Sequence, residues 1–150
     1  MGNTKSIGVA YSDQDIDGGT IGAVIPAAIV GTTVYATTEI GYTAAAQGTV
    51  TQATSKSTAV TLDKSAGRIT MNNASLATAT NATFVLNNST ISANDAVILT
   101  ISGGQATPGS YNVFANALSA GQVSITLRNI SGGALSEAVV INFAVIHGAS

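Results

Sequence analysis

The amino-acid sequence contains no Cys, no Trp and a single His among its 150 residues. The absence of Cys excludes disulfides, zinc–thiolate sites and cysteine nucleophiles. The single imidazole, that of His147, leaves little material for acid–base catalysis. The composition therefore argues against several large classes of enzyme before any motif is considered.

Charged residues are also scarce. Five Lys and Arg stand against seven Asp and Glu, so that 8% of the chain is charged and the net charge is −2, whereas roughly a quarter of a typical globular protein is charged. So few cations give no electrostatic footprint for a polyanion. No nucleic-acid partner is expected.

Neutral polar side chains take the place of charges. The sequence has 20 Thr, 15 Ser and 11 Asn, together with 25 Ala and 16 Gly, and its polar surface must be built from hydroxyl and amide groups. Such a surface is unusual for a free protein, which normally carries charge for solubility. It favours a protein that is packed against copies of itself.

An uncharged stretch near the N-terminus, residues 18–38, does not predict a membrane span. Pro26 and several Thr and Gly interrupt it, and its apolar part is shorter than the roughly 20 residues that a span requires. A signal peptide is not expected either, because Asp13, Asp15 and Asp17 follow the first apolar residues too closely. We therefore expect no membrane partner.

The pattern of the chain changes near residue 47. Residues 1–47 show poor periodicity and end in a Gly- and Ala-rich stretch, so they are expected to form an irregular N-terminal arm with a linker. From residue 48 onward apolar and polar residues alternate, most clearly in 122–128, where Val123, Ile125 and Leu127 share one face. This alternation predicts half-buried β-strands.

Similar runs recur along residues 48–150, separated by turn signals rich in Gly, Asn, Ser and Pro. The expected strands centre on Val50, Val60, Ile69, Phe84, Leu99, Val113, Ile125 and Ile141. Seven or eight strands in about 100 residues predict an all-β fold, an antiparallel β-sandwich or jelly-roll-like domain that follows the arm.

The last run, residues 137–146, is apolar on both faces. Such a strand is either central and covered on both sides, or covered on its second side by another chain. The residues expected at an oligomer interface are accordingly Val139, Val140, Ile141, Phe143, Val145 and Ile146.

One short acidic motif is the best candidate for a metal site. Asp13, Asp15, Asp17 and the Gly that follows match the opening of a calcium loop, in which alternate carboxylates converge on a hard cation. The twelfth position of that loop should be a bidentate Glu, but it is Val24. A solvated acidic turn is the favoured interpretation, and no metal or cofactor is expected.

Catalytic motifs are missing. There is no Gly-x-Ser-x-Gly sequence to supply a nucleophile, and His147 is expected to end the last strand in solvent. Asp95 and Glu137 could form a carboxylate pair of the kind that glycosidases use, but nothing in the sequence aims them at each other. The chain is not expected to be an enzyme. With four Tyr, three Phe and no Trp, a carbohydrate-binding module is a distant alternative.

The segment from Thr49 to the C-terminus resembles a β-domain found in bacteriophage virion proteins. The resemblance lies in residues 48–58, 67–71, 84–89 and, most specifically, 135–146, and the opening residues 7–15 are similar as well. It implies a structural virion protein, without catalytic residues, that assembles as a trimer. The first hypothesis is a capsid decoration (cement) protein, and the alternative is a head-fibre, tail-fibre or receptor-binding element.

Under the decoration hypothesis the trimer lies on the outer surface of the capsid, and the arm clamps the major capsid protein. Strand addition to exposed sheet edges would strengthen this adhesion. The arm residues expected to dock on the capsid are Ile7, Val9, Tyr11, Ile21, Val24, Ile25, Ile29 and Val30.

Overall fold

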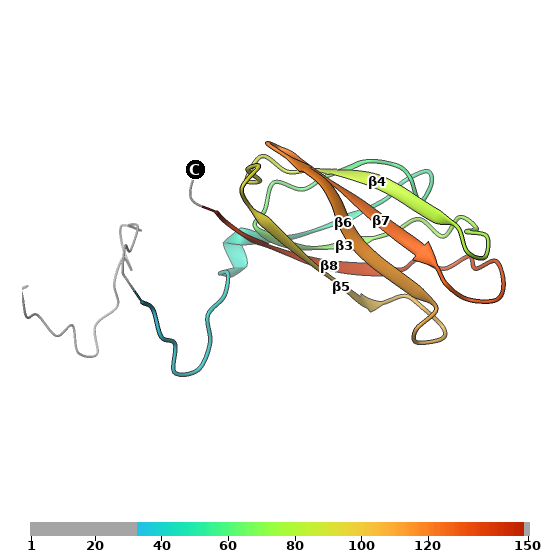
Figure 1. Ribbon diagram of the computed structural model, residues 1–150, viewed down its shortest axis with the longest axis horizontal. Helices are drawn as coiled ribbons and strands as arrows, with labels where there is room; N and C mark the ends of the chain where they lie inside the picture. Colours follow the sequence, from blue (N-terminus) through green and yellow to red (C-terminus); the bar gives the residue numbers. More distant parts are fainter. Residues whose placement is uncertain (1–32, 149–150) are drawn as a thin grey trace, which may run out of the picture. The chain divides into compact units, whose positions relative to one another are not determined.

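The computed structural model describes residues 33–148. Within this range the chain forms eight β-strands and one short 3-10 helix, and no α-helix, so the all-β prediction is confirmed. The elements are η1 (Ala44–Ala46), β1 (Gln47–Thr51), β2 (Val60–Thr61), β3 (Ala66–Thr70), β4 (Asn81–Asn87), β5 (Ala96–Gly103), β6 (Tyr111–Ser119), β7 (Gln122–Asn129) and β8 (Val140–Ile146) (Figure 1).

The strands build two four-stranded sheets that pack as a sandwich, β1-β3-β8-β5 and β2-β4-β7-β6. In the first sheet β8 lies between β3 and β5 and is antiparallel to both. In the second sheet β7 lies in the same way between β4 and β6. Two edge pairings are parallel, β1 with β3 and β2 with β4. Residue alternation does not reveal this detail, because the side-chain period is two in either direction.

The core lies between the sheets and uses the alternating residues that the sequence pattern predicts. Val123, Ile125 and Leu127 of β7 are completely buried. Phe84 and Leu86 of β4, which pairs with β7, are also buried. Burial of each such side chain stabilises the fold by about 2 kcal/mol.

Two glycines make room for the largest side chain of β8. The pairings place Gly48, Gly67 and Phe143 in one row across β1, β3 and β8. A Cβ atom added at Gly67 would lie 2.7 Å from the Leu62 side chain and 2.8 Å from the Phe143 ring. The glycines are therefore needed for the close approach of Leu62 and Phe143, and not for an unusual backbone conformation.

The chain divides into two units, Met1–Glu39 and Ile40–Ser150, and the sandwich belongs to the second. In the first unit the described residues, 33–39, have no regular secondary structure. In the second unit the Tyr42 hydroxyl donates a hydrogen bond to the Val145 carbonyl oxygen of β8. Part of the expected linker is therefore bound to the sandwich, and β1 begins at Gln47.

Candidate interface and polar site

The outer face of the β1-β3-β8-β5 sheet carries a neutral apolar surface, which we call the outer patch. Ile98 and Ile146 are 50% and 57% exposed. Ala144 pairs with Ile98, and Ala96 pairs with Ile146, so the two Ile side chains are diagonal neighbours on one face. The outer patch consists of Ala66, Ala96, Ile98, Ala144 and Ile146.

The structure assigns the predicted interface residues to two different environments. Val139, Ile141, Phe143 and Val145 are at most 4% exposed and belong to the sandwich core. They have no surface left with which to contact another chain, because the second sheet of the same chain covers them. Val140 is buried as well, and only Ile146 of the predicted set lies open on the outer patch.

The sequence could not separate these environments, because a strand that is apolar on both faces gives the same pattern in either case. Of the two arrangements considered above for this strand, the structure has the central one, because β8 lies between β3 and β5 in its sheet. Any contact with another chain is therefore restricted to its outward residues.

Two sets of predicted site residues lie outside the described part of the chain. They are the acidic motif and the capsid-docking residues, namely Asp13, Asp15, Asp17, Ile7, Val9, Tyr11, Ile21, Val24, Ile25, Ile29 and Val30. Among residues 33–148 there is no group of three or more His, Cys, Asp or Glu side chains that could hold a metal ion.

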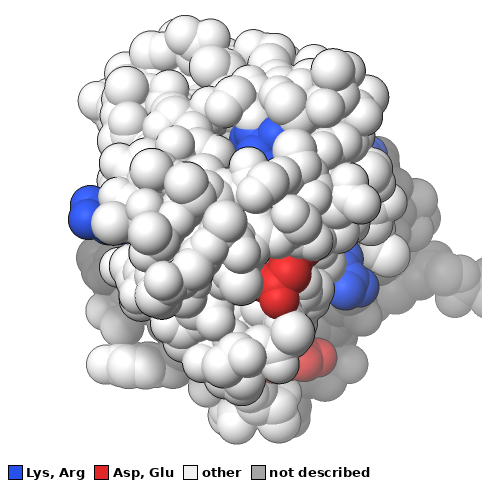
Figure 2. Space-filling model, turned by 90° about the vertical axis from the view of Figure 1, so that its right-hand side faces the viewer, with Lys and Arg blue, Asp and Glu red and all other residues white. Residues whose placement is uncertain are grey.

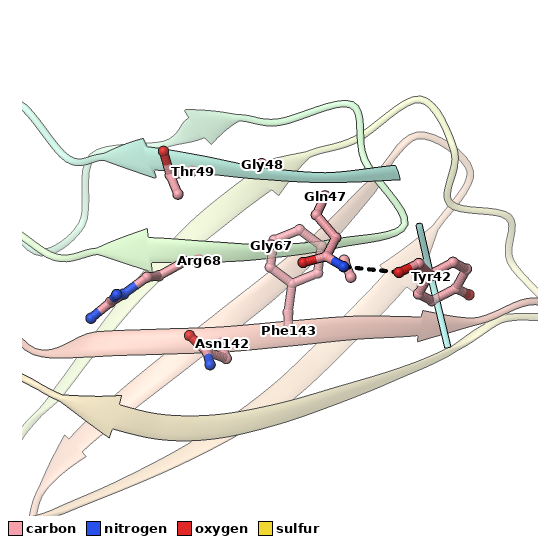
Figure 3. A pocket seen from close by; sticks show the side chains of 9 residues that line it. Tyr42, Gln47, Gly48, Thr49, Gly67, Arg68, Asn142 and Phe143 are labelled. Atoms are coloured by element: carbon pink, nitrogen blue, oxygen red, sulfur yellow. Dashed lines mark hydrogen bonds between the residues drawn. The ribbon is translucent and has the colours of Figure 1, made fainter. Parts of the chain in front are cut away.

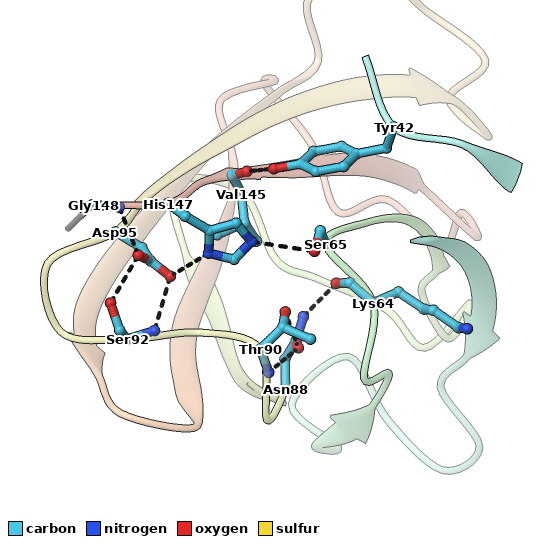
Figure 4. A network of polar contacts seen from close by, with 10 residues as sticks. All are labelled: Tyr42, Lys64, Ser65, Asn88, Thr90, Ser92, Asp95, Val145, His147 and Gly148. Carbon is cyan, nitrogen blue, oxygen red and sulfur yellow. Dashed lines mark hydrogen bonds and ion pairs between the residues drawn. The ribbon is translucent and has the colours of Figure 1, made fainter. Parts of the chain in front are cut away.

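A polar site forms where β3 and β5 begin and β8 ends. Because β8 is antiparallel to both neighbours, the residues just before β3 and β5 must meet the residue just after β8. These residues are Ser65, Asp95 and His147 (Figure 4). His147 Nδ1 lies 3.0 Å from Asp95 Oδ2, and His147 Nε2 lies 3.2 Å from Ser65 Oγ.

Several donors hold the Asp95 carboxylate in place. It accepts hydrogen bonds from the Ser92 backbone N–H and hydroxyl, both at 2.8 Å, and from the Gly148 backbone N–H at 2.9 Å. These bonds favour the charged form of the carboxyl group. The Ser92 backbone N–H contributes most to holding the pKa of Asp95 far below its ordinary value, and His147 contributes least.

The two members of the site differ in their access to solvent. The Asp95 side chain is only 1% exposed, whereas the His147 side chain is 41% exposed. The Tyr42 ring lies edge-on to the imidazole, with 6.5 Å between ring centroids. His147 thus follows the last strand in a partly solvated position, as expected, but both of its ring nitrogens have partners.

A second polar cluster lies at the opposite end of the same sheet, and Figure 2 views the sandwich from that end. Lys56 is 4% exposed, and its ammonium group donates to the backbone carbonyls of Asn72 and Glu137. The Glu137 Oε1 atom accepts from the Ala106 N–H at 2.8 Å. Burial lowers the pKa of Lys56, and the neighbouring Glu137 charge opposes this effect.

Asp95 and Glu137 therefore do not form a carboxylate pair. Asp95 precedes β5 and Glu137 precedes β8, and these two strands run in opposite directions. The two carboxyl groups lie at opposite ends of the sheet. This separation removes the geometric basis for a glycosidase-type site, because the sugar would have to lie between the carboxylates.

A hollow of about 570 Å³ lies on the side of β1 and β3 (Figure 3). Tyr42, Gln47, Arg68 and Asn142 are among the residues that line it, and the Gln47 side-chain amide donates to the Tyr42 carbonyl oxygen at 2.9 Å. The residues that line it include one guanidinium and the hydroxyls of Tyr42 and Thr49, and none of them is a carboxylate or an imidazole. No base or acid of the lining is placed to activate these hydroxyls, and the hollow offers a polar contact surface.

Comparison of the chain with protein-family models, with curated proteins and with solved structures gave no match. Among residues 33–148 no helix has the length and apolar character needed to cross a bilayer.

Proposed function

We propose that this chain is a structural protein of a bacteriophage virion, a capsid decoration protein that binds the outer surface of the head as a homotrimer. The observation that carries the proposal is the outer patch. A complete sandwich core leaves Ile98 and Ile146 exposed on a sheet face that is otherwise occupied by Ala at this end. The resemblance to virion β-domains supports the same role.

The chemistry of the outer patch favours a second copy of this chain as its occupant. The five residues of the patch are Ala and Ile and carry no charge. Two copies that meet through this patch can associate without desolvating an ion there, which would cost several kcal/mol, as long as the exposed Arg68 of the same face stays at the rim in water. Neighbouring hydroxyl and amide side chains, such as Thr100 and Asn142, can form the polar rim of such an interface.

The proposal gives the arm a separate task. The part of the arm that precedes Tyr42 would bind the major capsid protein, and the sandwich would hold three arms together. Linking three weak arms multiplies their effective concentration at the shell, so the trimer would bind more tightly than one arm. This role requires no catalytic residue, cofactor, nucleic acid or membrane.

The test of the trimer is the mass of the full-length chain in solution, measured by sedimentation equilibrium or native mass spectrometry. We expect a trimer for the natural sequence and a monomer for the Ile98→Lys, Ile146→Lys double variant. Ile130→Lys is the matched control, because Ile130 is 53% exposed but follows β7 in the other sheet. A monomeric natural chain, or a double variant that stays trimeric, would overturn the proposed interface.

The test of the decoration role is the number of copies per virion, measured by quantitative mass spectrometry against the major capsid protein. A number comparable to that of the shell subunit supports decoration. A handful of copies per particle overturns decoration and supports the fibre or receptor-binding alternative.

A further inference from the structure

We propose that Ser65, His147 and Asp95 form an acyl-transfer site, in which Ser65 Oγ is the nucleophile, His147 is the general base and Asp95 is a positioning residue. This activity is additional to the proposed virion role and does not depend on it. The proposal stands on the geometry of the polar site in Figure 4.

The hydrogen bonds define the roles of the two imidazole nitrogens. The Asp95 carboxylate can only accept, so His147 Nδ1 carries the proton in their 3.0 Å contact. In the neutral ring Nε2 is then free of a proton and accepts from the Ser65 hydroxyl at 3.2 Å. The carboxylate, the imidazole and the serine hydroxyl are therefore hydrogen-bonded in the sequence that nucleophilic serine sites require.

Asp95 is fixed independently of His147. Three bonds from Ser92 and Gly148 orient its carboxylate before the imidazole is considered. A carboxylate held in this way keeps one tautomer and one ring orientation of His147. It also stabilises the imidazolium that forms when the base takes a proton.

Hydrolysis of an ester at this site takes two steps, acylation and deacylation of Ser65. Ser65 Oγ attacks the carbonyl carbon of an ester while its proton passes to His147 Nε2, and the resulting tetrahedral species collapses with loss of the alcohol, which leaves with that proton. Water then attacks the acyl-serine, passes its proton to Nε2, and releases the carboxylic acid as Ser65 Oγ recovers the proton. No oxidant, metal or other co-reactant is needed.

The surroundings point to small acyl groups with good leaving groups. The imidazole is 41% exposed, so a small reagent reaches it from solvent. The Tyr42 ring beside the imidazole offers an apolar wall for a short acyl chain. Activated esters of acetate or butyrate are therefore the expected substrates.

The sequence does not reveal this site, because its members are 30 and 52 residues apart and precede or follow three different strands. A nucleophile elbow places its serine on a strand-to-helix turn. Here the antiparallel arrangement of β3, β8 and β5 alone brings the three residues together.

The first experiment is labelling of the full-length chain with a fluorophosphonate, followed by intact mass and peptide mapping, together with hydrolysis of p-nitrophenyl acetate. We expect one adduct on Ser65, and loss of both signals in Ser65→Ala. Ser57→Ala is the control, because Ser57 is an exposed serine in the loop between β1 and β2, and it should label like the natural chain. No adduct, or an adduct on another serine, would overturn the proposal.

The second experiment separates a base from a structural contact. We expect His147→Ala to slow labelling of Ser65 by about 100-fold or more, and added free imidazole to restore a measurable part of the rate. Circular dichroism of each variant checks that the sandwich remains folded. A folded His147→Ala variant that labels at the natural rate, or that labels slowly with and without imidazole, would contradict the assigned base.

Discussion

Where β8 ends, the partly exposed His147 covers the buried Asp95, and where β8 begins, the buried Lys56 lies beside Glu137. Both clusters arise where residues that flank the antiparallel strands β3, β5 and β8 meet, and Lys56 reaches the second cluster from the loop between β1 and β2. The exposed cluster satisfies its carboxylate with four donors. The buried cluster leaves the Tyr111 hydroxyl, Glu137 Oε2 and Gln105 Oε1 without a hydrogen-bond partner among the described residues.

The energetic consequences of the two clusters differ. The Lys56 ammonium group is removed from water and is compensated by two carbonyls and by the nearby Glu137 charge. Losing one member of such a set leaves the others buried and unpaired, which is costly. The His147 imidazole can be rehydrated if it loses a partner. The buried end is therefore expected to determine stability, and the exposed end is available for chemistry.

The largest effect is expected from Lys56→Ala. This change removes a buried side chain and leaves two carbonyl oxygens unpartnered, so the free energy of unfolding should fall by about 3 kcal/mol. Lys56→Met keeps most of the apolar stem and should recover at least half of that loss. Urea denaturation of the full-length chain, followed by circular dichroism, measures both values.

The matched control for this prediction is Lys64→Ala. Lys64 also donates to a backbone carbonyl, that of Ala45 at 2.8 Å, but the bond is exposed to solvent. Its loss should change the free energy of unfolding by less than about 0.5 kcal/mol. Equal losses of unfolding free energy for Lys56→Ala and Lys64→Ala would show that the burial of Lys56 does not determine its contribution to stability.

A smaller effect on the free energy of unfolding is expected at high pH, from the buried Tyr111 near Lys56 and Glu137. Burial, reinforced by the neighbouring Glu137, raises the pKa of Tyr111 to about 12. The unfolded chain loses the phenol proton near pH 10 and the folded chain only near 12, so Tyr111 lowers stability as pH rises through this window. The decrease should be on the order of 2 kcal/mol.

Lys56 has the opposite effect on stability. Because burial lowers its pKa in the folded state, its contribution to stability increases as the pH rises towards the ordinary pKa of a lysine. The comparison is therefore made between the natural chain and Tyr111→Phe, in which Lys56 is unchanged. Denaturation midpoints of the two proteins should diverge between pH 10 and 12, with the natural chain falling faster. Parallel curves would contradict the assigned burial of the phenol.

The sequence predicted the sandwich because its strands are half-buried and alternate cleanly. Val123, Ile125 and Leu127 show the physical reason, since each inward residue must be apolar to enter the core and each outward residue is free to be polar. Strand order is not encoded in this alternation. Consequently the parallel edge pairings could not be predicted from the sequence, and the central place of β8 was only one of two alternatives that its apolar faces allowed.

The candidate sites were harder to predict from the sequence, because strand order decides which residues meet. The sequence suggested Asp95 and Glu137 as a possible carboxylate pair, but the partners of each depend on which strands are neighbours. Ser65 carried no signal at all, because an isolated Ser before a strand is common. A composition with one imidazole favoured the absence of catalysis, yet one imidazole between a serine and a carboxylate is the arrangement that a nucleophilic serine needs.

The smallest effect is expected from His147→Gln at the exposed end. At neutral pH the variant should unfold at the same denaturant concentration as the natural chain within error, because the imidazole lies partly in water and a glutamine can occupy its place.

In acid both proteins should lose stability below about pH 4, since the pKa of Asp95 is depressed in the folded state and its stabilising effect disappears as the pH falls. This acid loss should survive in His147→Gln, because the Ser92 N–H contributes most to the depressed pKa of Asp95 and His147 contributes least. Denaturation curves at pH 7 and pH 3 test this, and a variant whose stability no longer depends on acid would show that the imidazole, and not the backbone, holds the carboxylate.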